Sequence, residues 1–236
     1  MDIHVDTGSI SNTVNKNNGN PFDCVYILSK KYRNVCEIRL KNLQMPLGFY
    51  NIRAPYNTIV INGTTYTITP GNYNSTTLVN ALNSAVTAGV GVFSITPISN
   101  RVQFIPASGS ATITSVSTTY PTLMNILGFT SGQTGNGIVA TNAYNINFDT
   151  YVYIYFVNLS TINSEAQRVA FKIPLNVGSG QIMNWVENSQ DYQVLKLQSI
   201  TEIFDRFIIQ VYDRYGNVID NNGIDWSFSV EIKTSA

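Results

Sequence analysis

One stretch near the C-terminus constrains the fold more than any other, because its apolar and polar residues alternate without a break. It places Trp226, Phe228, Val230 and Ile232 on one side and Ser227, Ser229, Glu231 and Lys233 on the other. Successive side chains of a β-strand point to opposite faces of its sheet. The pattern therefore predicts a strand with one buried and one solvent-facing side, as in an antiparallel sheet that covers a core.

Strand patterns recur along most of the chain. Asn62 and Gly63 stand between two runs of β-forming residues, and both favour the positive φ of a type I′ hairpin turn. Asn100 is expected to mark the turn of a second hairpin over residues 93–104. Further strands are expected over residues 22–28, 36–40, 111–116, 151–156, 168–174, 192–197 and 206–212.

Two segments carry helical signals instead. A helix is expected from Asn74 or Ser75, either of which can cap it, to a stop near Gly89. Its apolar residues recur at helical spacing: Leu78, Ala81, Leu82, Ala85 and Val86. A shorter helix is expected over residues 122–127, and a loop rich in Gly, Thr and Asn over residues 130–143.

Residues 1–20 are expected to form a flexible N-terminal arm. They hold few apolar side chains and end in the polar run from Asn15 to Asn20. Such a segment buries too little apolar surface to offset the entropy lost on ordering. Two interpretations stay open: a mobile terminus, or an arm that becomes ordered against a neighbouring subunit.

The charge balance excludes several classes of partner. Lys and Arg total 14 and so do Asp and Glu, so no net field attracts nucleic acid or anionic lipid. No apolar run approaches the ~20 residues of a membrane-spanning helix. Met1 leads directly into a polar stretch, so synthesis in the cytosol without a secretory leader is expected. With only 12% charged residues, the surface suits permanent burial against partners.

Catalytic signatures are missing from the sequence. Its single histidine, His4, falls in the expected arm, and there is no Gly-x-Ser-x-Gly, phosphate-binding loop or His/Cys metal spacing. The acidic segment from Asp213 to Asp225 does not match the helix-loop-helix calcium pattern, and tight turns explain it better than a calcium site. We therefore expect a protein that is not an enzyme, with no catalytic residues, no cofactor and no metal site.

The tyrosines of the strand over residues 151–156 allow two interpretations. Tyr151, Tyr153 and Tyr155 share one face, opposite an apolar face. They could stack against sugar rings or bases, but packing under a loop or against another subunit is the more common use of such a face. Nucleic-acid binding is not expected, because Lys and Arg are not interleaved with these rings.

Several motifs together resemble the penton, or minor capsid, proteins of virophages and polinton-like elements. Residues 59–83 read as strand, Asn-Gly turn, strand, then Thr-Pro-Gly-Asn-Tyr before a helix, and Ile-Leu-Gly-Phe follows at residues 126–129. The most specific part is Asp-Arg-Tyr-Gly from Asp213, with Asp220 and the Gly-Ile-Asp-Trp-Ser-Phe run that ends at Phe228. The resemblance covers roughly residues 22–234.

This resemblance implies a single eight-stranded jelly roll, of the all-β and mainly antiparallel class, over residues 21–236. More strands are expected than eight, so we predict an inserted β-α-β region around residues 56–142. The implied function is structural: a homopentamer that forms the vertex, or penton, of an icosahedral virion. Its implied partner is a double-jelly-roll major capsid protein, and its place is the capsid vertex of a virion made in the host cytoplasm.

The implied fold also bears on Cys24 and Cys36. The first two strands of a jelly roll belong to different sheets, about 10 Å apart. Because this exceeds the ~7 Å limit between the Cα atoms of a disulfide, we predict two free thiols.

Two alternatives from other classes remain at the level of sequence. The first is a carbohydrate-binding fibre or tail module on a β-sandwich, with the tyrosine face as its platform. The second is a glycosidase with a carboxylate pair, which has little support because no motif fixes which acids face each other.

Overall fold

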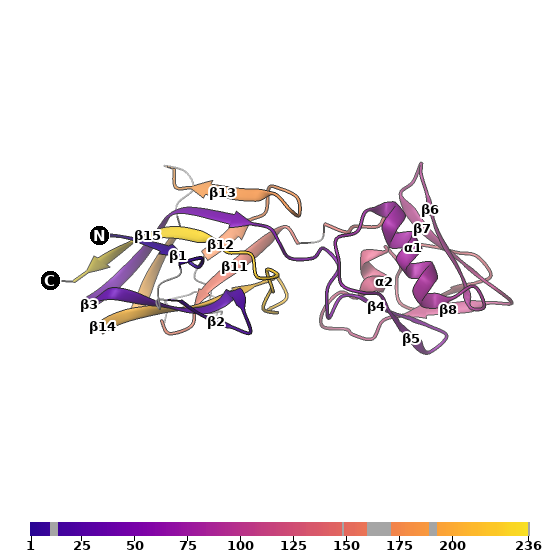
Figure 1. The fold of residues 1–236 in the computed structure, drawn as a ribbon. Helices are drawn as coiled ribbons and strands as arrows, with labels where there is room; N and C mark the ends of the chain where they lie inside the picture. Colours follow the sequence, from indigo (N-terminus) through magenta and orange to yellow (C-terminus); the bar gives the residue numbers. More distant parts are fainter. Residues whose placement is uncertain (10–13, 148, 160–170, 189–192, 236) are drawn as a thin grey trace. The chain divides into compact units, whose positions relative to one another are not determined.

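The computed structural model describes residues 1–235 apart from residues 10–13, 148, 160–170 and 189–192 (Figure 1). The chain divides into two units. The main unit consists of Met1–Phe49 and Asp149–Ala236, and the inserted unit consists of Tyr50–Phe148. The inserted unit thus extends slightly beyond both ends of the insertion expected over residues 56–142.

The main unit is an antiparallel sheet of eight strands in the order β1-β15-β3-β14-β11-β12, with β13 and β2 also paired to β3. Its strands are β1 (Asp2–Asp6), β2 (Val14–Asn17), β3 (Asn20–Pro46), β11 (Tyr151–Phe156), β12 (Phe171–Pro174), β13 (Ile182–Val186), β14 (Gln193–Tyr212) and β15 (Ser227–Thr234). The first residues of the strands expected from 168 and 192 lie outside the described residues. The expected all-β, antiparallel class is confirmed.

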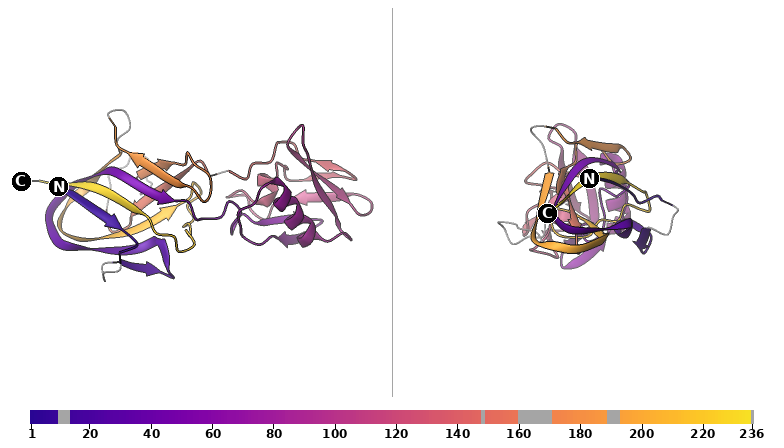
Figure 2. Two further views of the ribbon diagram at one scale, coloured as in Figure 1. Left: turned by 45° about the horizontal axis from the view of Figure 1, so that its top comes forward. Right: turned by 90° about the vertical axis from the view of Figure 1, so that its left-hand side faces the viewer.

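Strands β3 and β14 are long and run through both halves of this sheet. Gln193 at the start of β14 lies opposite Leu40, and Gln210 near its end lies opposite Asp23. Register shifts within residues 196–206 interrupt the ladder, and such shifts bend a strand and increase its twist. Both strands therefore curl back on themselves, which Figure 2 shows in two further views. Four strands expected separately from the sequence are in this way joined into two.

Aromatic contacts show that the curled sheet closes on a core. The ring centroid of Phe228 on β15 lies 6.0 Å from that of Phe156 on β11 and 6.2 Å from that of Phe207 on β14. Strands β15 and β11 are separated by two others in the sheet order, so the sheet faces itself in two layers, as in a jelly roll. The alternating apolar residues from Trp226 to Ile232 point into this core and are each at most 3% exposed.

The N-terminal residues are not the flexible arm that their composition predicted. Strand β1 pairs with β15, and β2 pairs with β3. Ile3 and Val5 alternate with polar residues and are buried at 9% and 0% exposure. A strand that adds to an existing edge needs few apolar residues of its own, because its backbone groups pair with that edge and two buried side chains already stabilise it. Residues 10–13 of the expected arm lie outside the described residues.

The two cysteines lie on one strand and not on two. Cys24 and Cys36 both belong to β3, and both thiols are free. The expected free thiols are confirmed, whereas the expected break between two strands is wrong, because β3 continues through the bend. Cys24 is buried, and this burial raises the pKa of its thiol to about 12. Cys36 is half-buried.

These environments predict selective labelling. At pH 8 a disulfide reagent should modify Cys36 in the folded protein and leave Cys24 unmodified, because the reactive species is the thiolate. Thiol titration should then give one reactive thiol per folded chain and two after denaturation. Cys36→Ser should leave no reactive thiol in the folded chain. An intramolecular disulfide in non-reducing peptide maps, or equal labelling rates, would contradict this placement.

The inserted unit has its own core and two small antiparallel sheets, in the orders β5-β4-β8-β9 and β10-β7-β6. Its elements are β4 (Thr58–Ile61), β5 (Thr64–Thr67), α1 (Ser75–Val86), β6 (Gly91–Thr96), β7 (Arg101–Pro106), β8 (Ala111–Thr114), α2 (Leu123–Ile126), β9 (Gln133–Gly135) and β10 (Ile138–Val139). The loop expected over residues 130–143 is wrong in part, since β9 and β10 pair there with β8 and β7.

Local signals of the sequence account for much of the inserted unit. Asn62 and Gly63 have φ values of 51° and 78°, so the expected hairpin turn is confirmed. Asn74 caps α1, because its side chain accepts a hydrogen bond from the Thr77 backbone at 2.9 Å. Asn100 has a φ of 50° at the turn between β6 and β7.

Candidate functional site

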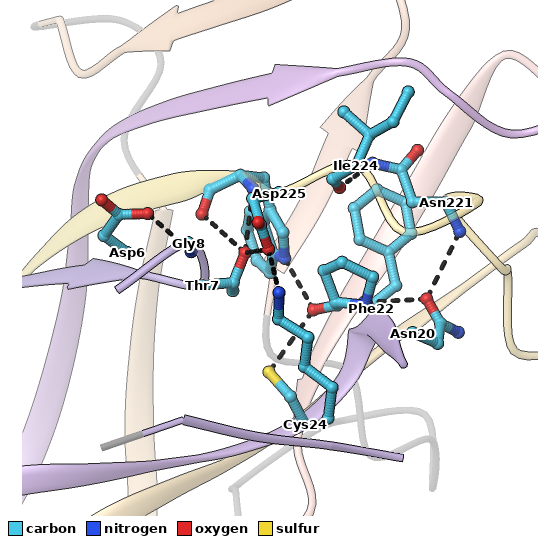
Figure 3. A network of polar contacts seen from close by, with 12 residues as sticks. Asp6, Thr7, Gly8, Asn20, Phe22, Cys24, Asn221, Ile224 and Asp225 are labelled. Atoms are coloured by element: carbon cyan, nitrogen blue, oxygen red, sulfur yellow. Dashed lines mark hydrogen bonds and ion pairs between the residues drawn. The ribbon is translucent and has the colours of Figure 1, made fainter. Parts of the chain in front are cut away.

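The acidic segment that carries the resemblance joins the N-terminal residues to the main sheet (Figure 3). The Asp225 carboxylate accepts a hydrogen bond from the Thr7 hydroxyl at 2.9 Å and forms an ion pair with Lys16 at 2.6 Å. The Thr7 hydroxyl in turn accepts the Trp226 backbone N–H at 2.9 Å. These contacts hold β1 and β2 against the start of β15, so the Asp-Trp pair has a structural role.

Trp226 contacts the same region from inside the core. Its indole N–H donates to the Pro21 carbonyl at 2.9 Å. Its ring centroid lies 5.6 Å from Phe22 in an edge-on contact and 5.0 Å from Phe228 in a stacked contact. A buried indole that finds an acceptor combines large apolar contact with a satisfied polar group.

Asn221, which is fully buried, connects the two ends of β3. Its side-chain NH2 donates to the carbonyls of Pro46 and Ile224 at 3.0 and 2.7 Å, and its oxygen accepts the Gly48 N–H at 2.8 Å. Its backbone N–H donates to the Asn20 side chain at 3.3 Å. A Cβ at Gly48 would lie 2.7 Å from the Asn221 backbone oxygen, so a larger residue at this position would require the backbone to shift.

Replacement of Asn221 by Ala should therefore destabilise the main unit by roughly 2–4 kcal/mol, because it leaves buried backbone donors and acceptors without hydrogen-bond partners. Denaturant unfolding monitored by tryptophan fluorescence measures the change. Asn184→Ala provides the matched control, since Asn184 is exposed on β13 and should cost less than about 0.5 kcal/mol. Equal effects of the two substitutions would contradict the role given to Asn221.

The remaining acidic residues of the segment belong to turns, as expected. Asp213 is fully buried, and its carboxylate accepts the backbone N–H groups of Tyr215 and Asn217 at 2.8 and 3.0 Å. Gly216 and Asn222 supply the positive φ values of the two turns, 84° and 52°. Within the described ranges, no three His, Cys, Asp or Glu side chains are grouped so that they could hold a metal ion.

His4 lies on β1 and not in a flexible arm. Its Nδ1 is 3.1 Å from the Ser229 hydroxyl on β15. The two residues lie opposite each other in the strand register, which explains the contact.

Among the described helices, none is long and apolar enough to cross a membrane.

The tyrosine face of the main unit carries a row of aromatic rings outside the core. Tyr151, Tyr153 and Tyr155 lie outside the core, because Val152, Ile154 and Phe156 between them are buried. Their neighbouring ring centroids are 5.1 and 6.3 Å apart, and Tyr212 on β14 extends the row with its ring 4.7 Å from Tyr155. The expected shared face is confirmed.

A pocket of about 520 Å³ adjoins this row of rings. Its lining includes Tyr153, Tyr155, Gln210, Tyr212, Arg214 and Tyr215. Burial raises the pKa values of Tyr155 and Tyr212, so both phenols remain neutral hydrogen-bonding groups. The sequence pattern identified the β11 tyrosines but not their partners on β14, because only the register brings Tyr212 opposite Tyr153.

The comparisons with known proteins give a likeness of fold. No protein-family model matches the sequence, and no curated protein matches it. The structure is similar to the crystal structure of the selenomethionine-labelled mavirus penton protein, with a TM-score of 0.51 and 9% sequence identity. The similarity covers 100% of both chains. The chain therefore has a penton-like fold over its full length.

Proposed function

We propose that this chain is a structural capsid protein that forms the pentameric vertex of an icosahedral virion. The full-length similarity to the mavirus penton protein carries the proposal, because it includes the inserted unit as well as the jelly roll. Five copies would close a ring by one contact between two different surfaces, repeated around the five-fold axis. Trimers of a double-jelly-roll major capsid protein would surround this ring.

The composition supports burial of this surface within a complete shell. Only 12% of the residues are charged, and the formal net charge is +0. The described surface also exposes aliphatic side chains that a partner can cover, among them Ile182 and Val186 on the same side of β13 at 58% and 67% exposure. Obligate interfaces are rich in such apolar area and poor in charge.

The N-terminal strands alter how assembly is proposed to occur. An arm over residues 1–20 would reach neighbouring subunits, but β1 and β2 pair within their own chain. We therefore assign subunit contacts to folded surfaces of the protein. We also propose a geometric role without catalysis.

The mass of the purified protein in solution tests the proposal. We expect a monomer, or a pentamer that dissociates on dilution, because a ring that closed too readily would assemble without a shell to fill. Light scattering over a hundredfold dilution series, with and without the major capsid protein, distinguishes these states. Stable dimers or trimers that resist dilution would contradict the vertex role.

A further inference from the structure

The pocket beside the tyrosine row has the features of a ligand site, which a structural vertex does not require. Its volume of about 520 Å³ falls in the range of roughly 300–1,000 Å³ typical of small-molecule sites. It lies between the outer face of β11 and β14 and the turn that carries Arg214 and Tyr215. All of these residues belong to the main unit.

The polar groups of this pocket are held in place before any ligand arrives. The Tyr212 hydroxyl donates to the Gln210 side-chain oxygen at 2.6 Å, and the Gln210 side-chain NH2 donates to Asp23 at 3.1 Å. The buried Asp213 carboxylate fixes the turn by accepting two backbone N–H groups. Fixed groups lose little entropy on binding, so the geometry favours a ligand of defined shape.

The aromatic lining suits a ligand that is apolar on one face and polar at its rim. Tyr153, Tyr155, Tyr212 and Tyr215 each offer a ring for contact and a hydroxyl for hydrogen bonding. A pyranose ring has this character, with C–H groups on its faces and hydroxyls around its edge. An oligonucleotide is a poorer fit, because its repeated phosphates call for a longer track of basic groups.

The charges in the pocket select among saccharides. Arg214 is exposed, and its guanidinium lies over the rings of Tyr151 and Tyr215 at 5.8 and 5.2 Å without an ion pair to any described residue. Outside the lining, Lys172 lies 4.1 Å from the centre of the Tyr151 ring, at the end of the tyrosine row. The one carboxylate of the lining, Asp213, is buried and hydrogen-bonded, so Arg214 is the exposed charge of the lining. Guanidinium groups bind carboxylates in a bidentate, charge-assisted manner.

We propose that this pocket binds an acidic saccharide, with a pyranose ring against the tyrosines and its carboxylate at Arg214. Gln210 and the tyrosine hydroxyls receive the hydroxyls at the rim of the ring. This activity does not depend on the pentameric assembly, since one chain supplies every group involved.

Titrations of the full-length protein with sialyllactose, trigalacturonate and neutral lactose test this site. We expect at least one acidic saccharide to bind roughly tenfold more tightly than lactose, and Arg214→Gln to remove that preference. Tyr155→Ala should weaken acidic and neutral saccharides alike. Arg101→Gln, an exposed arginine of the inserted unit, is the matched control and should change nothing.

Tyr155→Ala can lower the stability of the protein, so the test does not rest on that variant alone. Arg214 is exposed, and its replacement should leave the melting temperature unchanged. No binding of either acidic saccharide at millimolar concentration would overturn the proposal. Binding that survives Arg214→Gln undiminished would also overturn it, by placing the site elsewhere. A single-stranded oligonucleotide that binds in place of the saccharides, sensitive to Tyr155→Ala, would assign the pocket to nucleic acid.

Discussion

Replacement of Trp226 by Ala is expected to lower the free energy of unfolding of the main unit by about 3–5 kcal/mol. The indole is 2% exposed, stacks on Phe228 and meets Phe22 edge-on, so its loss leaves a cavity in the core. It also removes the indole donor and leaves the Pro21 carbonyl with the weaker Cys24 thiol contact at 3.4 Å. Both the cavity and the lost hydrogen bond destabilise the folded state.

Calorimetry and denaturant unfolding measure this loss. The inserted unit has a separate core, so a thermal transition that belongs to it should keep its midpoint while that of the main unit falls. Trp226→Phe is the conservative control: it keeps most of the packing, loses the hydrogen bond and should cost less than Trp226→Ala. A folded Trp226→Ala protein that loses under about 1 kcal/mol would show that the indole does not anchor the core.

Deletion of residues 1–7 should destabilise the main unit by roughly 3–6 kcal/mol. Burial of each aliphatic side chain contributes about 1.5–3 kcal/mol, and the deletion removes both Ile3 and Val5 from the core. It also removes Thr7, which binds Asp225 and Trp226. The edge of β15 that pairs with β1 then becomes exposed, so we expect aggregation at concentrations where the intact chain is dispersed.

Thermal unfolding of the truncated chain checks this expectation. Asp2→Asn is the matched control, because Asp2 is exposed on the same strand and its replacement should change stability by less than about 0.5 kcal/mol. A truncated protein with an unchanged melting temperature would restore the interpretation of the N-terminus as a flexible arm.

The features that could be predicted from sequence are those encoded by neighbouring residues. The turn at Asn62 and Gly63, the cap at Asn74 and the alternation after Trp226 each depend on a few positions and were all found where expected. The joining of strands in β3 and β14 was not predictable in this way, because its cause is a pairing between residues as distant as Asp23 and Gln210.

The same distinction separates the parts of the candidate sites. The acidic segment was recognisable in sequence as the most specific stretch, but its role depends on Thr7, Lys16 and Pro21 from the other end of the chain. The polar composition around Lys16 suggested disorder, because composition alone shows neither this ion pair nor the pairing of β2 with β3. Arg214 likewise gained its place beside the tyrosine row only through the fold.

The position of this chain in an assembled particle distinguishes a vertex protein from other capsid components. The chain should be expressed together with the major capsid protein proposed as its partner, and the resulting shells should be imaged by electron cryomicroscopy. The capsid account predicts five copies of the chain around each five-fold axis, with the jelly-roll main unit and the inserted unit both visible in every copy. Vertices occupied by another protein, or this chain found at three-fold or general positions, would contradict the account.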